Sequence, residues 1–141
     1  VLYERVREYF GLDDLQRIVP HLYPADEGRG AVQEKVAGLA SVVLQAADAG
    51  DRVAAALVRR ASAELADHIR AVYHKLGARR TVVGLHGGLF AAPRSDELLL
   101  EPLRRHPHLE GLDLEFETLG VRQGDRDALV EAMKFKVLSD G

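Results

Sequence analysis

Hydrophobic positions in the first half of the chain recur every three or four residues, which is the spacing of an amphipathic helix. This spacing predicts a short helix over residues 2–10 that ends at Gly11. Asp13 is expected to cap a second short helix over residues 14–19. A connection rich in proline, glycine and charged residues follows, so residues 1–30 are interpreted as short helices and a loop.

The longest periodic stretch predicts a helical hairpin over residues 31–77. Gly50 ends the first helix of this hairpin, Asp51 caps the second helix, and Gly77 ends it. Alanine is frequent in both helices, which allows their backbones to approach closely. The side chains expected to form the inward-facing stripe of the second helix are Val53, Leu57, Ala61, Leu65, Ile69 or His68, Val72 and Leu76.

The periodicity then changes and predicts strands. Residues 81–86 form a short apolar run that begins with β-branched residues, and residues 112–119 alternate between apolar and acidic side chains. Between these two segments, residues 96–105 are expected to form a helix that starts after Ser95. A strand, a helix and a second strand in this order form a β-α-β unit, in which the two strands are parallel.

A last helix is predicted over residues 126–137, so residues 78–141 comprise a β-α-β unit followed by a helix. Two strands make an incomplete sheet, and further strands are expected from a missing N-terminal half or from a partner chain. With 141 residues, of which 47% are hydrophobic, the chain is interpreted as a single α/β domain or a fragment, 1–141. The first residue is Val1 and not Met, which favours the fragment.

Composition narrows the classes of function. The formal net charge is −3 and the basic residues are interleaved with acidic ones, so nucleic acid is disfavoured as a partner. The absence of cysteine excludes disulfides, thiolate catalysis and cysteine-ligated metal centres. No run of about 18 apolar residues is present, so no membrane insertion is expected and the predicted location is cytoplasmic.

The best candidate for a binding site is the Gly87-Gly88 turn that follows the first strand. In α/β proteins ligands bind at the carboxyl ends of parallel strands, and glycine leaves the backbone open to a flat ligand. The surrounding glycines do not match the dinucleotide pattern G-x-G-x-x-G, and no Lys-Ser or Lys-Thr pair completes a phosphate-binding P-loop. The alternative interpretation is a plain tight turn.

No complete catalytic constellation is found elsewhere. His86 lies beside the turn, but a histidine at a strand end is more often a surface residue. His106 and His108 flank a proline with no third ligand at a suitable spacing, so no metal site is predicted. The acidic residues Asp113, Glu115 and Glu117 alternate along the second strand, which is typical of a solvated face.

Three segments of the chain together resemble a known family. They read LYERVREYFGLDDLQRIV, LASVVLQAADAGDRVAAALVRRASAELADHIRAV and VVGLHGGLF…ELLLEPLRR. They are similar to the C-terminal half of the bacterial N-acetylglucosamine kinase family. This family belongs to the sugar kinase–actin–Hsp70 ATPase superfamily, which also includes the ATPase activators of 2-hydroxyacyl-CoA dehydratases. The resemblance covers roughly residues 2–105 and implies a ribonuclease H-like fold, as in actin-like ATPases.

The resemblance also implies a function: the nucleotide-binding C-terminal portion of an ATP-dependent kinase for N-acetylglucosamine or another amino sugar, with ATP and Mg²⁺ as cofactors. Gly87 and Gly88 would face the adenosine or the α-phosphate, with Leu89 and Phe90 shaping the start of the next helix. The family's Gly-rich phosphate loop and catalytic aspartate would lie upstream of Val1, so no catalytic residue is assigned here. The competing hypothesis, from a different class, is a non-catalytic helical interaction or dimerisation module.

Overall fold

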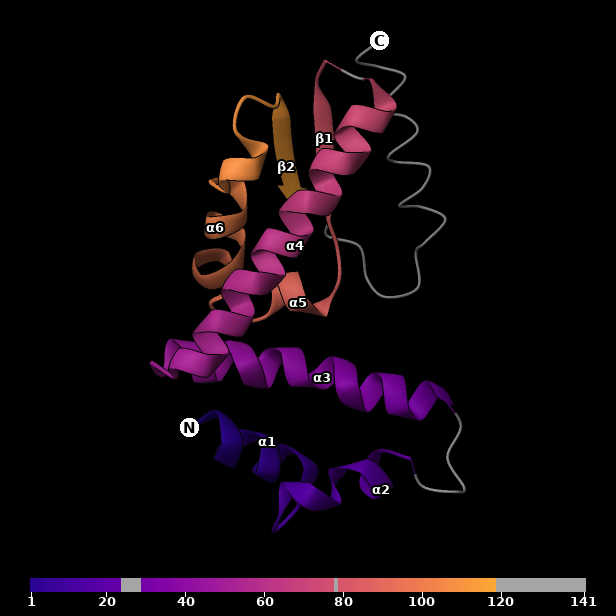
Figure 1. Cartoon of the computed structure of the whole chain (residues 1–141), viewed down its shortest axis with the longest axis vertical. Coiled ribbons are helices and arrows are strands. Elements are labelled where there is room, and N and C mark those ends of the chain that lie inside the picture. The colour runs from indigo at the N-terminus through magenta and orange to yellow at the C-terminus, as the bar shows by residue number, and fades with distance from the viewer. Residues whose placement is uncertain (24–28, 78, 119–141) are drawn as a thin grey trace.

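The computed structural model describes residues 1–23, 29–77 and 79–118. Over these residues the chain is a mostly helical α/β protein with a two-stranded parallel sheet (Figure 1), which confirms the predicted class at this level. The elements in chain order are α1 (Leu2–Phe10), η1 (Leu15–Arg17), α2 (Ile18–Leu22), α3 (Arg29–Asp48), α4 (Arg52–Leu76), β1 (Thr81–Leu85), α5 (Gly88–Ala91), η2 (Asp96–Leu100), α6 (Glu101–Arg104), η3 (Pro107–Leu109) and β2 (Leu114–Thr118). The helix predicted over 126–137 lies outside the described residues.

The N-terminal helices follow the prediction with one shift. Helix α1 ends at Gly11, which has a left-handed φ of 64° and donates its N–H to the carbonyl of Glu8. The next cap is Asp14 and not Asp13, because the Asp14 carboxylate accepts the N–H of Gln16 at 3.0 Å. This cap starts the 3₁₀-helix η1, and α2 then continues to residue 22.

Helices α3 and α4 meet at Gly50 and diverge from there (Figure 1), so the predicted hairpin is an open corner. At the corner, Ala46 of α3 and Ala54 of α4 are both fully buried. Alanine at these positions lets the two backbones approach closely where the helices meet. Asp51 caps α4 and Gly77 ends it, both as predicted.

The inward-facing stripe predicted for α4 is wrong at both ends. Val53 and Leu57 are 63% and 45% exposed, and the buried residues of α4 are Ala54, Val58, Ser62 and Ala66. Each step of four residues rotates by about 40° around a helix, so Val53 lies roughly 120° away from Leu65, which packs against the core. At the other end Val72 and Leu76 are 52% and 62% exposed, since the described residues do not cover them.

The two strands pair in parallel, with Thr81 opposite Leu114 and Leu85 opposite Thr118. Strand β1 ends one residue earlier than predicted and β2 begins two residues later, at Leu114, while the predicted end at residue 119 lies outside the described residues. Leu114 and Phe116 pack against the core, whereas Glu115 between them is exposed and forms an ion pair with Arg80 at 2.9 Å. The alternation of strand side chains therefore places Glu115 on the wet face, as the sequence pattern predicts.

The helix predicted as one piece over 96–105 is divided into the π-helical turn η2 and the short helix α6. The division falls just before Pro102, which has no N–H to donate and whose ring crowds the carbonyl four residues earlier. Ser95 does not cap this helix through its side chain. Its buried hydroxyl donates instead to the carbonyl of Phe90 at 2.8 Å, which ties η2 to α5.

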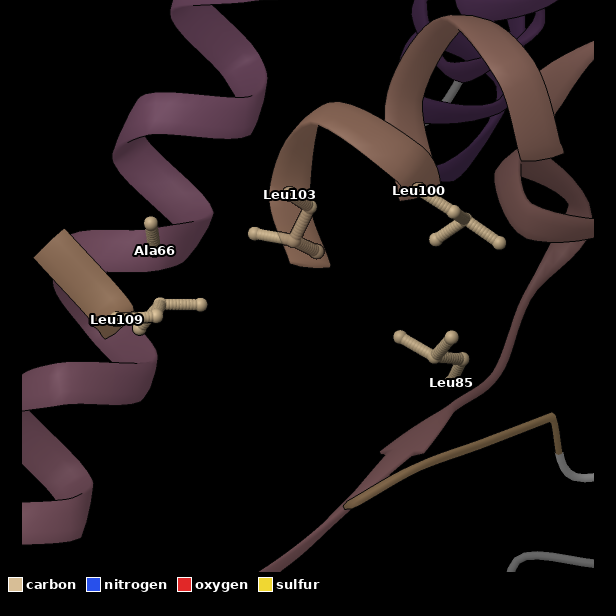
Figure 2. Close-up of a cluster of buried hydrophobic side chains, with 5 residues drawn as sticks. All are labelled: Ala66, Leu85, Leu100, Leu103 and Leu109. Carbon is tan, nitrogen blue, oxygen red and sulfur yellow. The ribbon is translucent and has the colours of Figure 1, made fainter. Parts of the chain in front are cut away.

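Two clusters of buried side chains hold these elements together. The first contains Ala66, Leu85, Leu100, Leu103 and Leu109, which converge from α4, β1, η2, α6 and η3 (Figure 2). The second contains Leu44, Val58 and Leu99. Helix α4 contributes to both clusters, and its buried Ser62 hydroxyl donates to the carbonyl of Leu99 at 3.2 Å. Helix α4 therefore connects the two buried clusters.

The contact between the start of α1 and the start of α4 is sensitive to acid, because it depends on the carboxylate of Asp51. Its carboxylate accepts the N–H groups of Ala54 at 3.0 Å, Leu2 at 2.8 Å and Val53 at 3.0 Å. These bonds, that of Ala54 first and that of Leu2 second, lower the pKa of Asp51 from 3.8 to about 2. Because the pKa is lower in the folded state, the stabilisation is present above about pH 4 and is lost as the pH falls toward about 2.

The Asp51→Asn variant keeps a capping side chain but has no carboxylate to protonate. As the pH is lowered from about 4 to about 2, we expect its free energy of unfolding to fall less than that of the wild type. Urea unfolding at a series of pH values measures the effect. An identical pH dependence in the two proteins would contradict the assignment of the low pKa to Asp51.

Candidate functional site

The Gly87-Gly88 turn lies at the carboxyl end of β1, where the chain leaves the sheet. Leu85, the last residue of β1, is 3% exposed and packs into the first buried cluster, whereas His86, Gly87 and Gly88 are all exposed. The turn is therefore a surface feature that rests directly on a buried strand end. This is the position predicted for a ligand-binding turn in an α/β protein.

Gly87 has a backbone conformation that only glycine adopts easily. Its φ is 110° and its ψ is 164°, a combination in which a Cβ atom collides with the residue's own backbone. Its carbonyl accepts the N–H of Phe90 at 3.1 Å, which closes the turn and starts α5. The sharp turn into α5 thus requires glycine at this position.

Gly88 differs from Gly87, because neither its backbone angles nor the described residues around it require a glycine there. Its φ is not positive, and a Cβ atom added to it would find no atom within 4 Å from the described residues outside the local helix backbone. As the first residue of a helix, it also has an N–H without an intrahelical acceptor. Gly88 therefore leaves an open approach to the backbone at the surface of the turn.

Leu89 and Phe90 point into the protein. Leu89 packs against the cluster formed by Leu44, Val58 and Leu99, and Phe90 packs against both buried clusters. Of the four residues predicted to form the site, the two glycines are thus exposed at the surface, while the two larger side chains anchor the turn to the core. Their apolar character in the sequence is explained by this packing.

Arg94 is a feature beside the turn that the sequence analysis missed. It has a left-handed φ of 66°, uncommon for a residue with a side chain. Its guanidinium bonds to Asp48 at 3.0 Å and to Glu97 at 2.7 Å, which links the end of α3 to η2. No local sequence signal marks it, because Asp48 is distant along the chain.

Of the remaining polar candidates, His106 and His108 lie together at η3. His106 and His108 lie with ring centroids 4.6 Å apart, and Nδ1 of His108 is 2.6 Å from a carboxylate oxygen of Asp67. In the parts of the chain that the structure describes, no three histidine, cysteine or acidic side chains converge to hold a metal ion. The pair His106 and His108 therefore serves the turn around η3, where Nδ1 of His106 accepts the N–H of His108 at 3.3 Å.

The candidate site is thus an exposed glycine turn at the end of β1, held in place by the packing of Leu85, Leu89 and Phe90 into the buried clusters. Among the helices that the structure describes, none combines the length and the apolar character needed to cross a bilayer. Comparisons of the chain with protein-family models, with curated proteins and with solved structures find no match.

Proposed function

We propose that this chain is the nucleotide-binding C-terminal portion of an ATP-dependent sugar kinase with a ribonuclease H-like fold. Its substrate would be N-acetylglucosamine or another amino sugar, and it would act in the cytoplasm. The observation that carries the proposal is the exposed Gly87-Gly88 turn at the carboxyl end of a parallel strand. A flat adenosine can lie against such a turn because no side chain covers the backbone.

The open space at Gly88 supports the fit of a nucleotide, since among the described residues no atom beyond Gly88's own helix backbone and its chain neighbours lies within 4 Å of the position of a Cβ there. Leu89 and Phe90 support it indirectly, because their packing holds the turn in place before a ligand arrives. Mg²⁺ would bridge the phosphates of bound ATP and neutralise their charge. Within the residues that the structure describes, no three histidine, cysteine or acidic side chains converge to hold a metal ion.

The sheet favours the same interpretation. It has only the strands β1 and β2 over the described residues, and such a small sheet normally continues into more strands. In the proposed kinase, other strands and the catalytic aspartate belong to the rest of the enzyme. The contribution of this chain is to bind and orient the nucleotide.

The matched substitutions Gly88→Ala and Gly30→Ala test the proposal. Neither added Cβ meets an atom of the described residues within 4 Å outside its own helix backbone, so both variants should keep the stability of the wild type. At Gly88 the methyl group would meet the nucleotide, and we expect the Kd for Mg-ADP to rise about tenfold, equivalent to about 1.4 kcal/mol. Chemical-shift titration of the backbone amides of residues 87 and 88 measures the Kd in each protein, and Gly30→Ala should bind as the wild type does.

An absence of shifts at Gly87 and Gly88 in millimolar Mg-ATP would contradict the proposal.

The second candidate function is a helical interaction module. It is favoured by four large apolar side chains that α4 exposes: Val53, Leu57, Val72 and Leu76. It predicts concentration-dependent association in sedimentation equilibrium, together with no response to nucleotide.

A further inference from the structure

The short connection between α5 and η2, residues 92–95, has an unusual backbone. Arg94 has a left-handed φ of 66°, a conformation that is disfavoured for a residue with a side chain. Among the described residues it is the only one besides glycine with a positive φ. Strain of this kind persists where the surrounding contacts hold it, and it is concentrated at functional regions of proteins. The contacts around Arg94 therefore indicate what this connection holds in place.

The residue after Arg94 is a buried serine whose donors point back toward α5. Ser95 is 2% exposed, its N–H donates to the carbonyl of Ala92 at 3.1 Å, and its hydroxyl donates to the carbonyl of Phe90 at 2.8 Å. Helix α5 has only four residues, and the carbonyls of a last helical turn have no donor within the helix. The Ser95 hydroxyl therefore satisfies a carbonyl that α5 leaves unpaired.

The ion pairs of Arg94 contribute less to this arrangement than its backbone does. The guanidinium bonds to Asp48 at 3.0 Å and to Glu97 at 2.7 Å, but the three side chains are between 43% and 63% exposed. Ion pairs with this exposure contribute little, because water screens them. Loss of the buried Ser95 hydroxyl, in contrast, leaves the Phe90 carbonyl without that donor where little water reaches it.

Phe90 connects Ser95 with the glycine turn. Its N–H donates to the carbonyl of Gly87 at 3.1 Å, and its own carbonyl accepts the Ser95 hydroxyl, so Phe90 is held from both sides. Gly87 and Gly88 have no side chains with which to fix the shape of the turn, which must be held from outside. A turn that is already in its binding conformation binds its ligand at a smaller entropic cost.

We propose that Ser95 is a positioning residue of the glycine turn: its hydroxyl holds the turn in the conformation that binds a nucleotide, and the left-handed backbone of Arg94 places this hydroxyl. Because it is buried, Ser95 does not contact the nucleotide itself. When the bond to Phe90 is lost, the turn spends less time in the competent conformation, and the affinity falls by the same fraction. This inference rests on the proposed nucleotide site.

Ser95→Ala and Ser62→Ala are matched variants that test the role of Ser95. Both serines are buried and both hydroxyls donate to a backbone carbonyl, but the acceptor of Ser62 is Leu99 in η2 and not a residue of α5. We expect both variants to lose stability. Only Ser95→Ala should also raise the Kd for Mg-ADP, by about tenfold, and accelerate hydrogen exchange of the Phe90 amide by a similar factor or more. The Kd is measured by chemical-shift titration, and the exchange is measured without nucleotide.

Arg94→Gly and Arg94→Val test the role of the left-handed backbone. Both substitutions remove the guanidinium, but glycine adopts a φ of 66° freely, whereas β-branched valine disfavours it. Arg94→Gly should therefore bind Mg-ADP as the wild type does, and Arg94→Val should raise the Kd about tenfold, as Ser95→Ala does.

Equal effects of Ser95→Ala and Ser62→Ala on the Kd and on Phe90 exchange would overturn the proposal, because they would show a general loss of stability. Equal Kd values for Arg94→Gly and Arg94→Val would also overturn it, and this comparison remains if Ser95→Ala does not fold. A wild type that does not bind Mg-ADP would contradict the nucleotide site itself. In that case Phe90 exchange still decides whether Ser95 holds the turn.

Discussion

Leu103→Ala should lower the free energy of unfolding by about 3 kcal/mol, within the usual range for a buried leucine. Leu103 is 1% exposed and lies between α4 and the sheet, where it packs with Ala66, Leu85 and Leu109 (Figure 2). The truncated side chain leaves a cavity that its neighbours cannot fill, since they are held by three different elements. In urea unfolding followed by circular dichroism, the midpoint should fall by roughly 1.5 M.

Leu76→Ala is the matched control, because it makes the same change of residue on a helix. Leu76 is 62% exposed in the last turn of α4, so its loss should change the free energy of unfolding by less than about 0.5 kcal/mol. Similar effects of the two substitutions would show that the cluster around Leu103 is not the core of the molecule.

Gly87→Ala should lower the free energy of unfolding by about 1–3 kcal/mol, the cost of holding a side chain in a backbone region reserved for glycine. At φ 110° and ψ 164° the variant must either accept this strain or change the turn. A changed turn would break the bond between the Phe90 N–H and the Gly87 carbonyl and would displace Phe90, which packs against both clusters. Thermal unfolding and the methyl resonances around Phe90 would report either outcome.

The comparison with Gly88→Ala makes this prediction specific. The two glycines are adjacent, but only Gly87 has a positive φ, and Gly88 has open space where a Cβ would be placed. Gly88→Ala should therefore keep or slightly raise stability, since alanine has less conformational freedom to lose on folding. If both substitutions destabilised the chain equally, strain at Gly87 would not be the cause.

Helix ends were predicted better than helix faces, for a local reason. Gly11, Asp51 and Gly77 act through hydrogen bonds and backbone angles within a few residues, so the sequence around them is sufficient. Asp13 was the exception, since two adjacent aspartates could each serve and Asp14 is the one that caps. Pro102 is a further local feature, since proline interrupts the hydrogen bonds of a helix, and it lies at the division between η2 and α6.

The candidate site was predictable only in part. A Gly-Gly pair after an apolar strand indicated the turn, and the structure adds that Gly87 is required by the backbone whereas Gly88 is not. The inward packing of Leu89 and Phe90 depends on Leu44, Val58 and Leu99, which come from distant segments. Arg94 has no local signature at all, because its partner Asp48 is brought beside it only by folding.

By itself, the sequence determined the two long helices α3 and α4 and the parallel pairing of β1 and β2, since periodicity, caps and turn residues act over short distances. Only the tertiary structure decided which side of α4 is buried. The larger residues Val53 and Leu57 remain exposed while the small residues Ala54 and Ser62 are covered, because α3 and η2 pack closely where small side chains allow it. Burial depends on what lies opposite a side chain, and that is set by the arrangement of distant elements.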